Sequence, residues 1–496
     1  MNDRPWRRDA FACAGLFLLA ALVRVLFLQS TVDRGLPFSI FYYGDSRVYR
    51  EFALAILRGE AFDQGLPFHP PGFAYALAAV IGVTGERPAL MRALLAIVSA
   101  SSIPLTYVLG LKIWGRGVAW TAALLATFSF GLLVSSVSPN SESIYVPILT
   151  AQAVLLVLLG DALCERRRAA SASLLGASGV LLGIGALTRA EHLAMTLLLP
   201  AALWLGWRSL GARRVLLVFL VLAASAALIV APWTFHSYRS ITRFNAANPG
   251  FPEPLPALVP VSGYGPLNFA LANNPSADGT FRADALLAPM GRGRLDLNDP
   301  GQRDLYLHGY RIGWEYLVGH PRDALLLAWR KIDLASDAFA LGLGGSNWPG
   351  GLRGTRRSVD LFVPESRIWK PVSLLLALCG AWLSRSRWRR ASVMWIAALH
   401  VTLVALSFFG YSRLFVQIAP LVACAQAAAL VGWALRFPSL RARRAVAAAG
   451  LALALVLFAQ IGGAARSPRN FRASGSVDPA TGKILQDAPV ELVPQP

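Results

Sequence analysis

The chain has 496 residues, of which 55% are hydrophobic and only 15% are charged. About a quarter of the residues of a soluble domain are charged, so this composition excludes an ordinary soluble protein. The formal net charge of +20 comes from 47 basic and 27 acidic residues. Most of the basic residues stand in short clusters between apolar runs, where the positive-inside rule accounts for them. We therefore exclude a nucleic-acid partner.

Apolar runs of about 20 residues recur along the chain, and each is long enough to cross a hydrocarbon layer of roughly 30 Å. They predict an all-α polytopic membrane protein with eleven transmembrane helices, the first of them uncleaved. The predicted spans are 10–29, 89–112, 117–137, 144–163, 171–188, 190–207, 214–234, 367–383, 391–409, 412–435 and 444–462.

Basic residues in alternate turns predict the orientation of these spans. Nineteen of them lie at the amino terminus and in the turns on its side, whereas the short turns on the other side hold only Arg189 and Arg413. Because basic residues are retained on the cytoplasmic side, the amino terminus is predicted to be cytoplasmic and the opposite turns extracytoplasmic.

The first outer loop, 30–88, contains two shorter segments with helical character. Residues 45–59 alternate apolar and charged side chains at helical spacing, and residues 70–85 open with two prolines and are too short to span. Counting 70–85 as a span would invert every later loop. We therefore predict two helices at the outer membrane interface.

The span pattern divides the chain into four parts. A first transmembrane module covers 1–234, a mixed extracytoplasmic segment covers 235–366, and a second transmembrane module covers 367–462. The polar, proline-containing remainder, 463–496, is predicted to be a flexible outer tail.

Two carboxylates stand at predicted outer helix starts. Asp45, in FYYGDSRVY, is either a helix cap or a general base at the membrane edge, since one carboxylate can serve as both. Glu142, in SPNSESIYVP, is favourable with the helix dipole, and it also lies in a tight outer turn where chemistry could occur.

Two arginines stand in the other outer turns. Arg189 and Glu191, in LTRAEHL, are as consistent with an interfacial ion pair as with a functional role. Arg413, in YSRLFVQIAP, has no acidic residue nearby in the sequence. Such an arginine either extends to lipid headgroups or binds an anionic ligand.

These motifs occur in the order GDSRVY, HPPGFAYALA, the SES turn, LTRAEHL, APWTFHSY with VPVSGYGPLNFALANNPSADG, and YSRLFVQIAP. Together they resemble the bacterial protein O-mannosyltransferase-like and lipid A aminoarabinose transferase-like glycosyltransferases of the GT-C architecture. The resemblance extends from about residue 10 to 435 and depends on the order and membrane side of the motifs, each of which is short.

The resemblance implies a role for each candidate residue. Asp45 takes the place of the first-loop catalytic carboxylate, and Glu142 that of the second-loop acid. Arg413 matches the basic residue of the late motif, and with His69 and Arg189 it is expected to bind the donor phosphate. Substrate-binding residues are expected within the same motifs: Tyr49, Tyr264, Asn273 and Tyr411.

The implied function is transfer of a sugar from a polyprenyl-phosphate carrier to a hydroxyl of a lipid, polysaccharide or protein acceptor. The enzyme would lie in the bacterial plasma membrane with its site on the extracytoplasmic face, and a single displacement would invert the anomeric configuration. Two alternatives stay open. One is a polysaccharide ligase or polymerase that uses a diphosphate-linked donor, and the other is a transporter, which should have broken polar helices and paired halves.

Asp45 is followed by Ser46 and Arg47, so the adjacent or alternate acid of a metal-binding pair is absent from this motif. We therefore expect neither a metal ion nor another cofactor. In a further departure from the family pattern, His236 stands where many members have arginine after the Pro-Trp pair.

Overall fold

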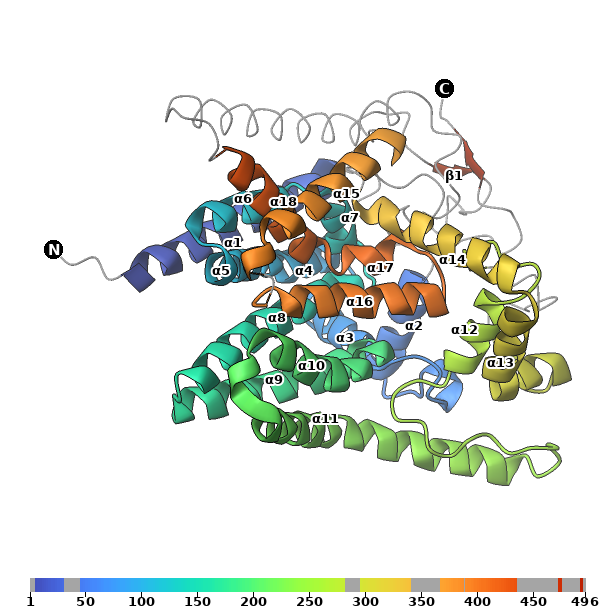
Figure 1. Cartoon of the computed structure of the whole chain (residues 1–496). Helices are drawn as coiled ribbons and strands as arrows, with labels where there is room; N and C mark the ends of the chain where they lie inside the picture. The colour runs from blue at the N-terminus through green and yellow to red at the C-terminus, as the bar shows by residue number, and fades with distance from the viewer. Residues whose placement is uncertain are drawn as a thin grey trace.

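A computed structural model describes residues 5–30, 45–281, 295–339, 366–387, 389–434, 472–474 and 491–493. Its described elements are helices, except for a short antiparallel pair, β1 (Arg472–Ser474) and β2 (Glu491–Val493), within the predicted tail. The helices pack as a bundle with a smaller helical layer at one end (Figure 1). The predicted all-α membrane architecture is confirmed.

The helix bounds follow the predicted spans closely. The corresponding elements are α1 (Pro5–Ser30), α4 (Pro88–Ala100) with α5 (Ser102–Ile113), α6 (Arg116–Thr127) with α7 (Phe130–Val137), α8 (Glu142–Cys164), α9 (Arg168–Thr188), η2 (Ala190–Ala194) with α10 (Met195–Gly206), α11 (Gly211–Ala247), α15 (Ser366–Leu383), α16 (Ser392–Ser407), and α17 (Ser412–Val416) with α18 (Ala419–Ala434).

Not all of these elements are long enough to be counted as spans. Among the described residues, five are long and apolar enough to cross a membrane, or six if the bent pair α6 and α7, at 55°, is one span. The remaining apolar helices are shorter, and the eleventh predicted span, 444–462, lies outside the described residues. The count of eleven therefore stays a prediction.

The two helices predicted in the first outer loop are present as α2 (Asp45–Leu57) and α3 (Gly72–Thr84). They pack on each other through a small apolar core that includes Tyr49, Phe73 and Leu77. Gly72 starts α3 against the backbone of Leu187, and a Cβ at this glycine would lie 2.7 Å from the Leu187 carbonyl. This close approach brings the His-Pro-Pro-Gly loop beside the end of α9.

The helix α11 continues without a break to Ala247, 13 residues past the end of the predicted span at 234, and the predicted boundary at residue 235 stays a prediction. Pro232 lies inside this helix, and α11 continues past it although an interior proline removes one backbone hydrogen bond and its ring clashes with the carbonyl four residues earlier. The described remainder of the predicted mixed segment consists of loops, the helices α12 (Gly265–Ala272), α13 (Pro300–Gly319) and α14 (Pro321–Ser336), and the turn η5 (Asp337–Phe339). The described elements of this segment are helical.

A buried lysine joins the predicted outer layer, which consists of α12, α13 and α14, to the end of α16. Lys331, which is 1% exposed, donates hydrogen bonds to the Oδ1 atom of Asn273 at 2.8 Å and to the carbonyl of Leu406 at 3.0 Å. Burial lowers its pKa to about 7. The amide group of Asn273 in turn donates to the carbonyl of Ser407 at 2.9 Å. One polar cluster thus joins the end of α12, α14 and the last two residues of α16.

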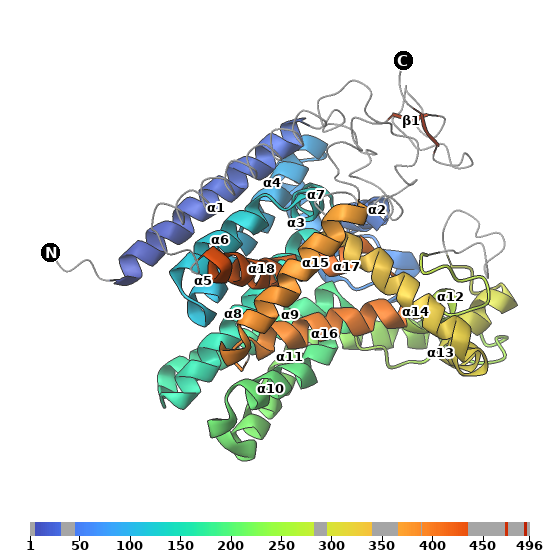
Figure 2. The same ribbon diagram turned by 45° about the horizontal axis from the view of Figure 1, so that its top comes forward.

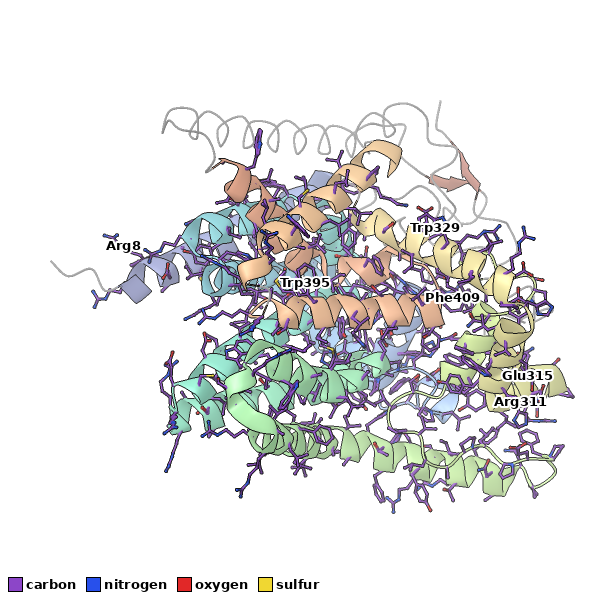
Figure 3. All side chains as sticks on the ribbon, in the orientation of Figure 1. Arg8, Arg311, Glu315, Trp329, Trp395 and Phe409 are labelled. Atoms are coloured by element: carbon purple, nitrogen blue, oxygen red, sulfur yellow. The ribbon has the colours of Figure 1, made fainter. Side chains whose placement is uncertain are left out.

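The turns predicted to be cytoplasmic lie together at one end of the bundle. The guanidinium of Arg387, in η7 (Arg385–Arg387), donates to the carbonyl of Ile113 at 3.0 Å, and Trp114 donates to Ser384 at 2.7 Å. At the opposite end lie α12, α13 and the carboxyl end of α16, as Figure 2 shows from a second direction. Arg8 and Phe409 mark the two ends (Figure 3).

This arrangement makes the predicted membrane sidedness testable. In a background without the four native cysteines, we expect Arg213→Cys to react with a membrane-impermeant maleimide only after the membrane is permeabilised, because its turn holds a basic cluster. Ser276→Cys, which is exposed at the other end, should react in intact cells. Reaction of both positions from the same side would contradict the orientation.

Candidate functional site

The outer helix starts converge on one place. The hydroxyl of Ser46, in the first turn of α2, donates to the Oδ1 atom of Asn140 at 2.7 Å, and both side chains are buried. Asn140 belongs to the short turn between α7 and α8 that the sequence analysis singled out for Glu142. The two carboxylates predicted to be catalytic are therefore brought together from segments about a hundred residues apart.

Arg413, at the start of α17, lies between these two carboxylates. Its guanidinium is 2.6 Å from the Oδ2 atom of Asp45 and 4.0 Å from the Oε1 atom of Glu142. The side chain of Asp45 is 50% exposed, whereas that of Glu142 is only 2% exposed. The expectation that no acid neutralises Arg413 is wrong, because its partner lies 368 positions earlier in the chain.

Arg189 continues this charged network on the other side of Glu142. It donates to the Oε1 atom of Glu142 at 2.8 Å and to the Oε1 atom of Glu191 at 2.5 Å, and its side chain is 15% exposed. The order of charges is therefore Asp45, Arg413, Glu142, Arg189, Glu191, with signs alternating along the series. Buried charges of this kind need such pairing to offset their desolvation.

The charge of Asp45 is stabilised by its neighbours. Burial raises the pKa of this carboxyl, but the Arg413 guanidinium, which is also its hydrogen-bond partner, lowers it by more, so the pKa lies below its usual value. Asp45 is therefore ionised at neutral pH. A carboxylate in this state and half exposed can accept a proton.

Aromatic side chains fix the charged groups in place. The ring of Tyr411 lies 5.1 Å below the Arg413 guanidinium, a cation–π contact, and its hydroxyl accepts the backbone N–H of Phe281 at 2.8 Å. Tyr49, buried on α2, packs edge-on against Phe73 with ring centroids 4.9 Å apart. Of the predicted substrate-binding residues, Tyr49 and Tyr411 thus border the charged network.

His69 and Tyr264 form a neighbouring group. Their rings meet edge-on with centroids 4.6 Å apart, and His69 is also hydrogen-bonded to Asp63. Asp45 is near enough to raise the pKa of His69. Asp63 is not among the predicted site residues, since its only signal in the sequence is an Asp-x-Gly turn six residues before His69.

Asn273, predicted to bind substrate, has another place in the structure. It is 1% exposed, and its amide is occupied by Lys331 and by the carbonyls of Phe269 and Ser407. This accounts for Asn273 as part of the outer-layer clamp. Its role in substrate binding stays a prediction that no contact here supports.

The carboxylates of the site form ion pairs with arginine side chains. Among the described residues, no three histidine, cysteine or acidic side chains gather in a way that could hold a metal ion. Asp45 and Glu142 converge instead on Arg413, a fixed cation that occupies the position between them.

We therefore expect the sugar transfer predicted from the motifs to continue in EDTA at a rate close to that without chelator, since no divalent ion is needed to hold the two carboxylates together. The measurement is the initial rate in EDTA alone and in EDTA with excess Mg²⁺ or Mn²⁺. If EDTA abolished the activity and the ions restored it, a metal ion rather than Arg413 would hold the two carboxylates together.

Solved structures with a similar fold exist, although no protein-family model matches the sequence and no curated protein matches it. An oligosaccharyltransferase of Archaeoglobus fulgidus, tethered to an acceptor peptide containing the NVT sequon, aligns with a TM-score of 0.54 and 13% identity over 92% of this chain. The same enzyme, AglB, in complex with an inhibitory peptide and a dolichol-phosphate, aligns with a TM-score of 0.52 and 15% identity, again over 92% of this chain.

The chain spans about half the length of that oligosaccharyltransferase, 55% and 56% in the two structures. ArnT from Cupriavidus metallidurans, bound to undecaprenyl phosphate, aligns less well, with a TM-score of 0.39 and 14% identity over 85% of this chain and 79% of that one. The likeness to the archaeal enzyme confirms the GT-C fold that the motif order predicts.

Proposed function

From this GT-C fold and the charged network at its outer helix starts, we propose that the chain is an inverting membrane glycosyltransferase. It takes a sugar from a polyprenyl-phosphate carrier and transfers it to a hydroxyl acceptor on the extracytoplasmic face of the bacterial plasma membrane. The bilayer supplies the donor, and the acceptor is a lipid, a polysaccharide or a protein.

One observation carries this proposal: an exposed carboxylate and a partly exposed guanidinium lie side by side at a helix start that is predicted to lie at the membrane surface. Asp45 and Arg413 are 2.6 Å apart, with side chains 50% and 34% exposed. A transfer from a sugar phosphate needs these two groups, because a base must take the proton of the attacking hydroxyl and a cation must stabilise the leaving phosphate.

The pairing of Asp45 with Arg413 suggests how the donor prepares the site. The oxygens of a bound phosphate compete with the Asp45 carboxylate for the same N–H groups, since guanidinium binds both kinds of anion in the same fork geometry. Binding of the carrier phosphate to Arg413 thus weakens the ion pair between Arg413 and Asp45. The Asp45 carboxylate then becomes a stronger base. Glu142, 2% exposed and held by Arg189, keeps Arg413 in position during this exchange.

In the transfer step, the acceptor oxygen attacks the anomeric carbon from the face opposite the phosphate. Its proton passes to Asp45 while the carbon–oxygen bond to the phosphate breaks, and the phosphate leaves with the bonding electrons. No covalent enzyme intermediate is needed, because the carrier phosphate is already a good leaving group. The anomeric configuration is inverted.

The test is a transfer assay with purified protein and two radiolabelled donors, a polyprenyl monophosphate sugar and the corresponding polyprenyl diphosphate sugar. Transfer from the monophosphate with inversion supports the proposal. Use of the diphosphate donor alone would point to the ligase or polymerase alternative. Movement of intact solute across vesicles without bond cleavage would point to a transporter.

The acceptor can be identified separately. Glycolipid, polysaccharide and glycoprotein profiles of a deletion strain should lack one glycan, which the parent gene restores and a gene carrying Asp45→Asn does not. If that variant restored the glycan, the biological role would not depend on Asp45 as the base.

A further inference from the structure

We propose that Asp63 is a positioning residue that fixes His69 as a hydrogen-bond donor to the donor phosphate. This inference rests on the proposed function, because it assigns a second contact to the phosphate that Arg413 binds. It concerns a pair of side chains from the loop between α2 and α3.

The pair is held by three short contacts. The Nδ1 atom of His69 lies 3.1 Å from the Oδ1 atom and 3.0 Å from the Oδ2 atom of Asp63, and the backbone N–H of His69 donates to Oδ2 at 2.6 Å. The Asp63 side chain is only 5% exposed, and that of His69 is 27% exposed. A buried carboxylate therefore faces one edge of a ring whose remainder reaches the surface.

The backbone at Asp63 is unusual. Its φ of 54° lies in the left-handed region, which non-glycine residues seldom adopt, although aspartate tolerates it better than most. The residue starts the turn η1 (Asp63–Gly65). This conformation allows one carboxylate to meet both the backbone and the ring of His69, six residues later.

Rings from two other segments enclose His69. Phe52, on α2, has its ring centroid 5.3 Å away, and Tyr264, just before α12, has its own 4.6 Å away. Tyr264 in turn stacks on Phe68 at 5.1 Å. The hydroxyl of Ser262 donates to the carbonyl of Phe68, and the backbone N–H of Gly263 donates to the carbonyl of Pro67. The ring is thus fixed on several sides.

The contact with Asp63 determines which ring nitrogen of His69 carries a proton. Because an ionised carboxylate only accepts hydrogen bonds, the Nδ1 atom must carry a proton. The Nε2 atom then accepts when the ring is neutral and donates when it is an imidazolium. Among the described residues, the Nε2 atom has no hydrogen-bond partner, so it is available to a ligand. Only the imidazolium can bind a phosphate through it.

The charged and titratable groups that face the ring favour the imidazolium. Asp63 and Asp45 favour it through their negative charge, whereas Tyr49 and Tyr264 also adjoin the ring and are neutral. Burial lowers the pKa of His69, but the two carboxylates raise it by more, Asp63 by both its charge and its hydrogen bond, so the pKa lies above 6.5. Asp63 thus extends the pH range in which His69 is a cation.

The test compares Asp63→Asn with the parent protein in two measurements. The first needs no ligand: histidine ring resonances of isotope-labelled protein are followed through pH, with His69→Gln assigning the His69 signal. Asparagine keeps the shape of Asp63 and loses its charge, so the His69 midpoint should move to lower pH. An unchanged midpoint would overturn the inference.

The second measurement is the affinity for a polyprenyl phosphate in mixed micelles from pH 5.5 to 8.5. Between the two His69 midpoints, Asp63→Asn should bind about tenfold more weakly than the parent, which is the usual loss for a charge-assisted hydrogen bond. Below both midpoints, the two proteins should bind alike. The His69→Gln profile corrects for titration of the phosphate itself, whose second pKa is about 6.

A double-mutant comparison separates positioning from folding. In a His69→Gln background, Asp63→Asn should have no further effect on affinity at any pH. An equal loss in both backgrounds and at all pH values would show that Asp63 only maintains the loop. Failure of the parent to bind polyprenyl phosphate would instead overturn the proposed function, while the midpoint shift of His69 would still test the pair.

Discussion

Replacing Asp45 with asparagine should lower turnover by about 10² to 10⁴-fold, the usual contribution of a positioned general base, while folding persists. Asparagine fits the same space as aspartate and is tolerated at a helix start, so α2 should still begin at residue 45. It cannot accept a proton near neutral pH. The measurement is kcat with saturating donor and acceptor, together with the thermal unfolding midpoint in the same detergent.

A matched control lies six residues further along the same helix. Glu51 forms an ion pair with Arg47 at 3.1 Å, and its side chain is 44% exposed. Exposed pairs of this kind contribute little, so Glu51→Gln should keep nearly the parent rate. If Asp45→Asn kept the parent unfolding midpoint and more than about a tenth of the parent activity, a general-base role would be ruled out. The base would then have to be sought at Glu142.

Replacing Arg413 with alanine should raise the donor KM by about 10 to 150-fold, because one charge-assisted contact to phosphate is lost, worth about 1.5–3 kcal/mol. A second effect follows from the ion pair with Asp45. Arg413 lowers the pKa of Asp45 and burial raises it, so removal of the guanidinium should raise that pKa. Since Asp45 acts in its ionised form, the acid limb of the pH–rate profile should move to higher pH.

Arg50→Ala is the control for this substitution. Arg50, on α2, forms an exposed ion pair with Glu86 at 2.6 Å, so its loss removes a cation near the surface without touching the network. Donor saturation should be unchanged in this variant. If Arg413→Ala also left the donor saturation curve unchanged, the phosphate contact would have to be reassigned to Arg189 or His69.

The sequence predicts most of the fold because membrane helices follow hydrophobicity and length. The segment predicted at 45–59 is a helix at Asp45–Leu57, and the span predicted at 144–163 lies within Glu142–Cys164. The end of α11 could not be predicted from hydrophobicity, because the helix continues past its apolar stretch into the polar residues 235–247.

It was easier to predict which residues form the site than which of them contact each other. Asp45, Glu142, Arg189 and Arg413 were singled out as ionisable residues in outer turns, and the structure brings all four together. Their pairing was missed, because Arg413 meets an acid from the other end of the chain and no local pattern encodes such a distance. Asp63 was missed because a short aspartate turn is common, and its contact with His69 depends on one backbone angle.

The clamp around Lys331 has a consequence for engineering. It ties the outer helices to the residues just before Arg413, and Gly410 adjoins the Lys331 backbone so closely that an added Cβ would lie 2.3 Å from its carbonyl oxygen. Gly410 also donates its backbone N–H to the carbonyl of Gly279 at 2.8 Å. The outer helices therefore cannot be exchanged with those of another protein as an independent unit. A chimera that carries the outer segment of another transferase must retain Gly279, Asn273 and Lys331 if Arg413 is to keep its place.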